Sequence, residues 1–247
     1  KPTSNMANGR RAMIGGLAAK VEAASRANVA HWKGRKVKPA PQASKISSAA
    51  LAESTDKVIA IGASTGGVEA LHQIITRFPS SMPGIVIVQH MPAGFTKMFS
   101  ERLNSLSAMT VKEAEPGDRI MRGRVLVAPG DLHTRVVRSG GIYKIICEQG
   151  EKVSGHRPSV DVMMKSVSEN AGSNAIGVML TGMGSDGARG MLAMRRAGAR
   201  TMAQDEQTSV VFGMPMKAYE NGGAEKLVPI DKIAQTVISY LSGGTNG

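Results

Sequence analysis

Residues 57–78 read KVIAIGASTGGVEALHQIITRF, which is an apolar run, a turn of small residues and an amphipathic segment in that order. The run at 58–63 is apolar on both faces, which is typical of a strand buried inside a parallel sheet. Ser64 follows the run, and the glycines at 66 and 67 permit a tight turn before the helical pattern of 68–78. This order of strand, turn and helix predicts an α/β fold.

The same alternation continues along the rest of the chain. Further strands are predicted at 84–90, 125–129, 143–147, 175–182 and 199–204, and further helices at 159–171, 188–198 and 232–241. Strand patterns follow one another from Met109 to Glu148 without a helix, so an antiparallel excursion is expected there. The predicted fold class is α/β: a doubly wound, mainly parallel sheet with helices on both faces and an antiparallel hairpin excursion.

Positive charge is concentrated near the N-terminus. The net charge is +12, and residues 1–50 hold ten Lys and Arg against one acid, Glu22, hence +9, which leaves +3 for the remainder. The segment is rich in Ala, Ser, Gly and Lys without a sustained apolar period, so we assign 1–54 as a basic flexible interdomain linker and 55–247 as the folded domain. Because that domain is close to neutral, and aromatics make up only 3% of the chain, no nucleic-acid partner is expected.

Cysteine content and hydropathy indicate the compartment. The single cysteine, Cys147, excludes an intramolecular disulfide, which favours a reducing environment. No apolar stretch approaches the roughly 20 residues of a membrane span, and the N-terminus lacks a secretory signal. We therefore expect a cytoplasmic protein without membrane insertion. The chain starts at Lys1 and not at a methionine, so further sequence is expected upstream.

Three predicted strand ends carry residues that are typical of acyl-transfer chemistry. Ser64 ends the predicted strand at 57–64, His90 ends the predicted strand at 84–90, and Asp186 lies in a glycine-rich turn after the predicted strand at 175–182. Because functional groups of an open parallel sheet gather at the carboxyl ends of its strands, these side chains are expected at one edge. A serine, a histidine and an aspartate at one place suit the roles of a nucleophile, its base and the residue that orients the base.

Other interpretations of the same residues remain open at this point. Ser64 fits a helix cap, His90 a buried core histidine and Asp186 a turn former between glycines. The segment GASTGG at 62–67 also fits a phosphate cradle in a nucleotide- or phosphate-binding regulatory module, although it lacks the lysine of a P-loop. In hydrolases with a G-x-S-x-G elbow, the serine is followed along the chain by the acid and then by the histidine. Here no histidine follows His156, so none comes after Asp186, and the ordinary esterase fold is excluded.

The chain from about Lys57 to Leu241 resembles the catalytic domain of the chemotaxis protein-glutamate methylesterases (CheB type). The resemblance rests on VIAIGASTGG, IVIVQHMP, VLVAPGDLH, HRPSVDVMM, LTGMGSDGARGM and AQDEQTSVVFGMP, in this order. It implies Ser64 as nucleophile, His90 as base and Asp186 as acid, with the backbone N–H of Met183 in the oxyanion site. Thr65 N–H, near the start of the following helix, is expected as a second oxyanion donor.

The resemblance also implies a reaction and partners. The expected reaction is hydrolysis of γ-glutamyl methyl esters on the cytoplasmic helices of methyl-accepting chemoreceptors, with deamidation of receptor glutamines in some members. It implies an N-terminal receiver domain in the full-length protein, upstream of the basic linker. Neither a cofactor nor a metal ion is expected, and we expect a monomer. Arg157, next to His156, is a further candidate for contact with the substrate, with a structural cap around Ser159 as the alternative. His133 is a candidate for bordering the cleft, with a surface role as the alternative.

Overall fold

The computed structural model of the protein describes residues 21–22, 25 and 56–241. The chain forms two compact units, Lys1–Lys36 and Val37–Gly247. In the first, Val21 and Glu22 are helical, and the Ser25 hydroxyl donates a hydrogen bond to the Glu22 carbonyl at 2.8 Å. The predicted linker at 1–54 otherwise lies outside the described residues, and everything below concerns 56–241.

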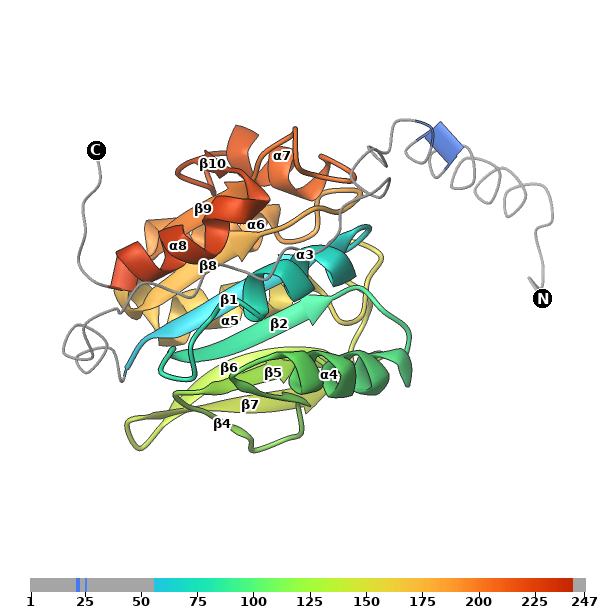
Figure 1. Cartoon of the computed structure of the whole chain (residues 1–247). Helices are drawn as coiled ribbons and strands as arrows, with labels where there is room; N and C mark the ends of the chain where they lie inside the picture. The colour runs from blue at the N-terminus through green and yellow to red at the C-terminus, as the bar shows by residue number, and fades with distance from the viewer. Residues whose placement is uncertain (1–20, 23–24, 26–55, 242–247) are drawn as a thin grey trace, which may run out of the picture. The chain divides into compact units, whose positions relative to one another are not determined.

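Seven strands form one parallel sheet in the order β10-β9-β8-β1-β2-β5-β3 (Figure 1). The strands are β1 (Val58–Ala63), β2 (Gly84–Gln89), β3 (Thr110–Glu113), β5 (Arg124–Val127), β8 (Ala175–Met179), β9 (Arg200–Gln204) and β10 (Leu227–Val228). All residues of β1, β2 and β8 are buried, as the runs that are apolar on both faces predict.

Helices cover both faces of this sheet, which confirms the predicted doubly wound α/β class (Figure 1). One apolar core joins the sheet to α3 (Gly67–Ile75), α4 (Phe95–Leu106) and α8 (Ile230–Leu241). The other joins it to α5 (Val160–Asn170), α6 (Ala188–Arg196) and α7 (Met214–Glu220). A short 3-10 turn, η2 (Gly172–Asn174), follows α5.

The antiparallel excursion is present and forms a second sheet of three strands, in the order β4-β7-β6. It consists of β4 (Arg119–Ile120), β6 (His133–Ser139) and β7 (Ile142–Glu148), and it packs on the core that also contains α5. The excursion is narrower than the predicted range of 109–148, because β3 and β5 within that range belong to the parallel sheet.

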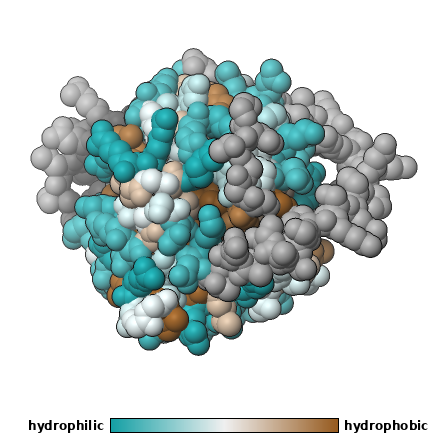
Figure 2. Space-filling view, turned by 90° about the vertical axis from the view of Figure 1, so that its left-hand side faces the viewer, coloured by the Kyte–Doolittle hydropathy of each residue, from teal (hydrophilic) through white to brown (hydrophobic). Residues whose placement is uncertain are grey.

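The strand order places one edge of the sheet at a topological switch point. From β1 the chain crosses by α3 to β2 on one side, and from β8, on the other side of β1, it crosses by α6 to β9. In such sheets ligands bind outside the carboxyl ends of the strands where the order reverses, here between β1 and β8. Figure 2 looks at the opposite end of the sheet, whose surface is mostly hydrophilic.

Candidate active site

Ser64, His90 and Asp186 lie at the carboxyl edge of three adjacent central strands. Ser64 directly follows β1, His90 directly follows β2, and Asp186 lies in the turn between β8 and α6. Backbone hydrogen bonds continue past the strand ends and hold the three turns together: Leu180 N to Gly62 O at 2.8 Å, Ser64 N to Thr181 O at 3.0 Å and His90 N to Ala63 O at 3.1 Å. The structure thus places all three predicted residues at one edge.

Two buried polar side chains that the sequence pattern does not mark as functional fix these turns. The Gln89 amide Nε2 donates to the carbonyl oxygens of Ser64 at 3.0 Å and His90 at 3.2 Å. On the other side, the Thr181 hydroxyl donates to the carbonyl of Thr65 at 3.0 Å and accepts from the N–H of Val211 at 2.9 Å. Gln89 ends a strand that is otherwise apolar, and this is the one sequence signal that sets it apart.

We expect Gln89→Met to lower the free energy of unfolding by about 1–3 kcal/mol, because the His90 carbonyl loses its amide donor and the Ser64 carbonyl keeps only the N–H of Gly67. The substitution keeps the length of the side chain and does not alter the Ser64 and His90 side chains themselves. Urea unfolding measures the effect, with Gln73→Met as control, since the Gln73 amide bonds Glu69 on an exposed helix surface. Equal stability of the two variants would contradict the structural role of Gln89.

His90 and Asp186 form a close pair. Nε2 of His90 lies 2.7 Å from Oδ2 of Asp186, and their side chains are only 7% and 1% exposed. The other ring nitrogen, Nδ1, is buried and has no hydrogen-bond partner among the described residues. A carboxylate on Nε2 favours the tautomer with the proton there, so Nδ1 is left as the acceptor.

The Asp186 carboxylate accepts hydrogen bonds from three further donors at the N-terminus of α5. The Ser159 hydroxyl donates to Oδ1 at 2.7 Å, Val160 N donates to Oδ2 at 2.8 Å, and Asp161 N donates to Oδ1 at 3.1 Å. The Ser159 hydroxyl also accepts a hydrogen bond from Val162 N and so caps α5. The positive end of the helix therefore faces the carboxylate.

These contacts keep Asp186 ionised in a buried place. Burial alone works to raise the pKa of its carboxyl group, but the hydrogen bonds from His90, Ser159 and the two backbone N–H groups outweigh burial. The pKa of Asp186 consequently lies below its ordinary value. A charged carboxylate beside Nε2 can both orient the imidazole and stabilise its protonated form.

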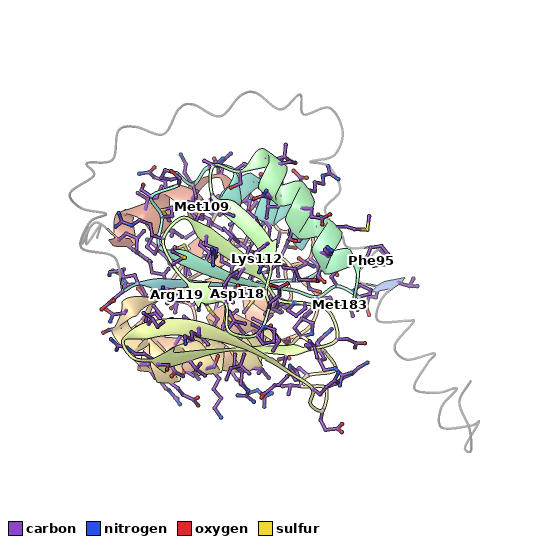
Figure 3. All side chains as sticks on the ribbon, turned by 90° about the horizontal axis from the view of Figure 1, so that it is seen from below. Phe95, Met109, Lys112, Asp118, Arg119 and Met183 are labelled. Atoms are coloured by element: carbon purple, nitrogen blue, oxygen red, sulfur yellow. The ribbon has the colours of Figure 1, made fainter. Side chains whose placement is uncertain are left out.

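Two backbone N–H groups beside Ser64 are available to a ligand. Neither Thr65 N nor Met183 N donates to an acceptor in the described part of the chain, although their neighbours Ser64, Gly67 and Gly182 do. Figure 3 shows Met183 at the same end of the molecule as Phe95. Phe95 is the first residue of α4, the helix that follows His90 in the chain. Unpaired N–H groups at a helix start and a glycine turn suit an anionic oxygen.

A cavity of about 320 Å³ adjoins His90. Arg157 lines it, donates to the Gly150 carbonyl at 2.7 Å and lies 3.4 Å from the Asp131 carboxylate. Its Nε atom is buried without a partner among the described residues. The structure therefore brings Arg157 close to His90, as a candidate for substrate contact requires.

The position of His133 corrects a prediction. We expected it to border the cleft, but it is 3% exposed at the start of β6. Nε2 bonds the Glu151 carbonyl at 2.8 Å, and Nδ1 accepts from Ser159 N at 3.3 Å. Because protein groups engage both ring nitrogens, His133 supports the Ser159 loop and has no free group for a substrate.

No cluster of three or more His, Cys, Asp or Glu side chains that could hold a metal ion occurs in residues 21–22, 25 and 56–241. Over the same residues, no helix is long and apolar enough to cross a membrane.

The fold and the site together define a class: doubly wound α/β proteins with a serine, a histidine–aspartate pair and free backbone N–H groups at the switch point of the sheet. Residues 59–237 match the family model described as CheB methylesterase. The chain belongs to the CheB methylesterase family.

Relatives and a solved structure agree with this membership. A protein of Syntrophotalea carbinolica named protein-glutamate methylesterase/protein-glutamine glutaminase is 62% identical over 98% of this chain and 69% of its own length. A protein of the same name from Sulfurimonas denitrificans is 60% identical over 78% of this chain and 54% of its own length. The crystal structure of the Thermotoga maritima CheB methylesterase catalytic domain is 41% identical with a TM-score of 0.73, covering 74% of this chain and 98% of that one.

Proposed function

We propose that this chain hydrolyses γ-glutamyl methyl esters of a protein substrate through an acyl-enzyme on Ser64. The observation that carries the proposal is the pair of His90 and Asp186, 2.7 Å apart, at the strand end beside Ser64. Membership of the CheB methylesterase family favours this function over a nucleotide- or phosphate-binding module built on GASTGG.

In the proposed reaction the Ser64 hydroxyl oxygen attacks the acyl carbon while its proton moves to His90. The receiving nitrogen is Nδ1, since Nε2 is engaged by Asp186 and Nδ1 has no described partner. The proton then passes to the leaving oxygen, methanol departs, and an ester of Ser64 remains. Water, deprotonated by the same nitrogen, attacks this ester and releases glutamate and free Ser64.

Charge develops on two groups during each attack. The imidazolium of His90 gains its counter-charge from Asp186, whose carboxylate is already ionised and fully hydrogen-bonded. The negative oxygen of the tetrahedral intermediate takes the N–H groups of Thr65 and Met183. Both stabilising elements are in place before the substrate arrives, so little reorganisation is needed.

The substrate we propose is a cytoplasmic helix of a methyl-accepting chemoreceptor. Relatives at 60–62% identity are named both methylesterase and glutaminase, and the same steps with ammonia as leaving group would deamidate a receptor glutamine. Arg157, in the cavity beside His90, is our candidate for contact with acidic residues of that helix.

We further propose that residues 55–247 are the catalytic domain, that 1–54 is a linker, and that the full-length cytoplasmic protein carries a receiver domain before it. The relatives extend beyond the matched region, since the chain covers 69% and 54% of the two described above. A longer relative leaves room for such a domain.

The direct test is methanol release from methylated receptor membranes incubated with this chain. We expect release, and we expect a serine-directed phosphonate to stop it while adding its mass to the peptide that contains Ser64. As a control, a chain that is heat-unfolded before the phosphonate is added should carry no adduct after digestion. An active chain whose adduct lies on another serine, or a chain that releases no methanol, would contradict the proposal.

A further inference from the structure

A second histidine lies against the base. The ring of His156 stacks on the ring of His90, with centroids 3.7 Å apart and planes inclined by 7°. His156 comes from the loop before α5, more than sixty residues along the chain from His90, and lines the cavity that adjoins it. Its sequence neighbour Arg157 lines the same cavity.

The His90 ring needs a second constraint beyond its hydrogen bond. Its Cβ end is fixed by the backbone, and its Nε2 end is fixed by Asp186. The ring plane is set by rotation about the Cα–Cβ and Cβ–Cγ bonds, which one hydrogen bond at Nε2 restrains without locking, and this rotation carries Nδ1 toward or away from Ser64. A flat group parallel to the ring at 3.7 Å blocks that rotation from one side.

His156 is itself held firmly by its backbone. Val153 and His156 exchange two hydrogen bonds, Val153 N to His156 O at 3.1 Å and His156 N to Val153 O at 2.9 Å. The two residues between them, Ser154 and Gly155, have φ of 53° and 81°, as in a tight type I′ hairpin turn. The loop therefore presents the His156 ring from a rigid turn.

We propose that His156 is a positioning residue for His90, whose stacked ring keeps the His90 imidazole in the plane that directs Nδ1 at Ser64. This inference rests on the proposed function, because it assigns His90 as the base. The flat face of His156 matters here, and its own ring nitrogens take no part in proton transfer.

Two substitutions of similar volume separate stacking from space filling. His156→Phe keeps a flat ring, whereas His156→Leu fills the space without one. We expect kcat for methanol release to fall about 10²-fold in His156→Leu with little change in KM, because the base is misplaced and the substrate contacts are not. His156→Phe should stay within about fivefold of the wild type, since the planar contact is retained.

The matched control is His72→Leu, on α3 and outside the site, which should leave both constants unchanged. Thermal unfolding checks that each variant is folded. Equal kcat values for the Leu and Phe variants would overturn the inference, since shape would then not matter. An inactive wild type would instead contradict the proposed function, so the two failures are distinguishable.

The pH profile of the wild type gives an independent measurement. Burial lowers the pKa of His156, as do the charges of His90 and Lys152, while Asp186 raises it. The Asp131–Arg157 ion pair lines the same cavity. His156 therefore stays neutral to a lower pH than an ordinary histidine, and its protonation below that pH places a positive charge against the His90 ring.

We expect kcat/KM of the wild type to fall more steeply in acid than kcat/KM of His156→Phe. The second proton binds to a ring that phenylalanine lacks. Identical acid limbs in the two proteins would show that His156 does not act on His90 and would overturn the inference.

Discussion

Substituting Ser64 by alanine is expected to lower kcat for methanol release by about 10⁵-fold or more while the fold persists. Ser64 is only half-buried, and the contacts that fix its turn come from its backbone N–H and carbonyl, which alanine retains. His90→Ala should cost about as much, because a hydroxyl without its base is a weak nucleophile. Activity is measured on methylated receptor membranes and folding by thermal unfolding.

Non-additivity sharpens this prediction. Because Ser64 and His90 act in the same proton transfer, the double variant should be no slower than either single variant. Ser105→Ala is the matched control, since this hydroxyl bonds only the Arg102 carbonyl on the exposed side of α4. Near-normal methanol release by a folded Ser64→Ala protein would end the case for an acyl-enzyme on this residue.

Asp186→Asn is expected to lower kcat by about 10³- to 10⁴-fold, less than the loss of Ser64. The asparagine amide offers one acceptor oxygen where the carboxylate accepts from His90, Ser159, Val160 and Asp161. If its NH₂ group faces His90, the imidazole takes the wrong tautomer, with its proton on Nδ1. If it faces α5, buried N–H groups meet a donor instead of an acceptor.

The same substitution should reduce stability in a pH-dependent way. The pKa of Asp186 is below its ordinary value of 3.8, so the charged carboxylate stabilises the fold at neutral pH, and this contribution is lost as pH falls through the lowered pKa. We expect urea unfolding to show Asp186→Asn less stable by about 1–3 kcal/mol at pH 7, with the gap narrowing in acid. A gap that grows in acid would contradict the assigned ionisation.

Much of the fold could be predicted because the central strands carry an unusually clear pattern. β1 and β2 are apolar over their whole length and are buried on both faces. The helix α4 was not predicted, since its buried face includes Thr96 and Ser100 beside Phe99 and Leu103, which weakens the apolar period. The helix α7 was not predicted either, because it is only seven residues long and has a proline near its start.

The positions of the site residues follow from the sequence, but their partners do not. Strand ends predict where Ser64, His90 and Asp186 lie, because parallel strands finish at one edge. The three donors to Asp186 at the start of α5 lie about 25 positions earlier in the chain, directly after the antiparallel strands. Packing between α5 and α6 decides such contacts. His133 was misplaced for another reason: it is the first residue of β6, which belongs to the antiparallel sheet.

The attachment of the site to β1, β2 and β8 has a consequence for how the protein loses its activity. These strands occupy the middle of the sheet and are covered on both faces, so we expect their amide hydrogens to exchange only on global opening. We expect local opening of the edge strand β10 to leave Ser64 and His90 in place. Ser64 and His90 are therefore expected to separate only when the whole domain unfolds.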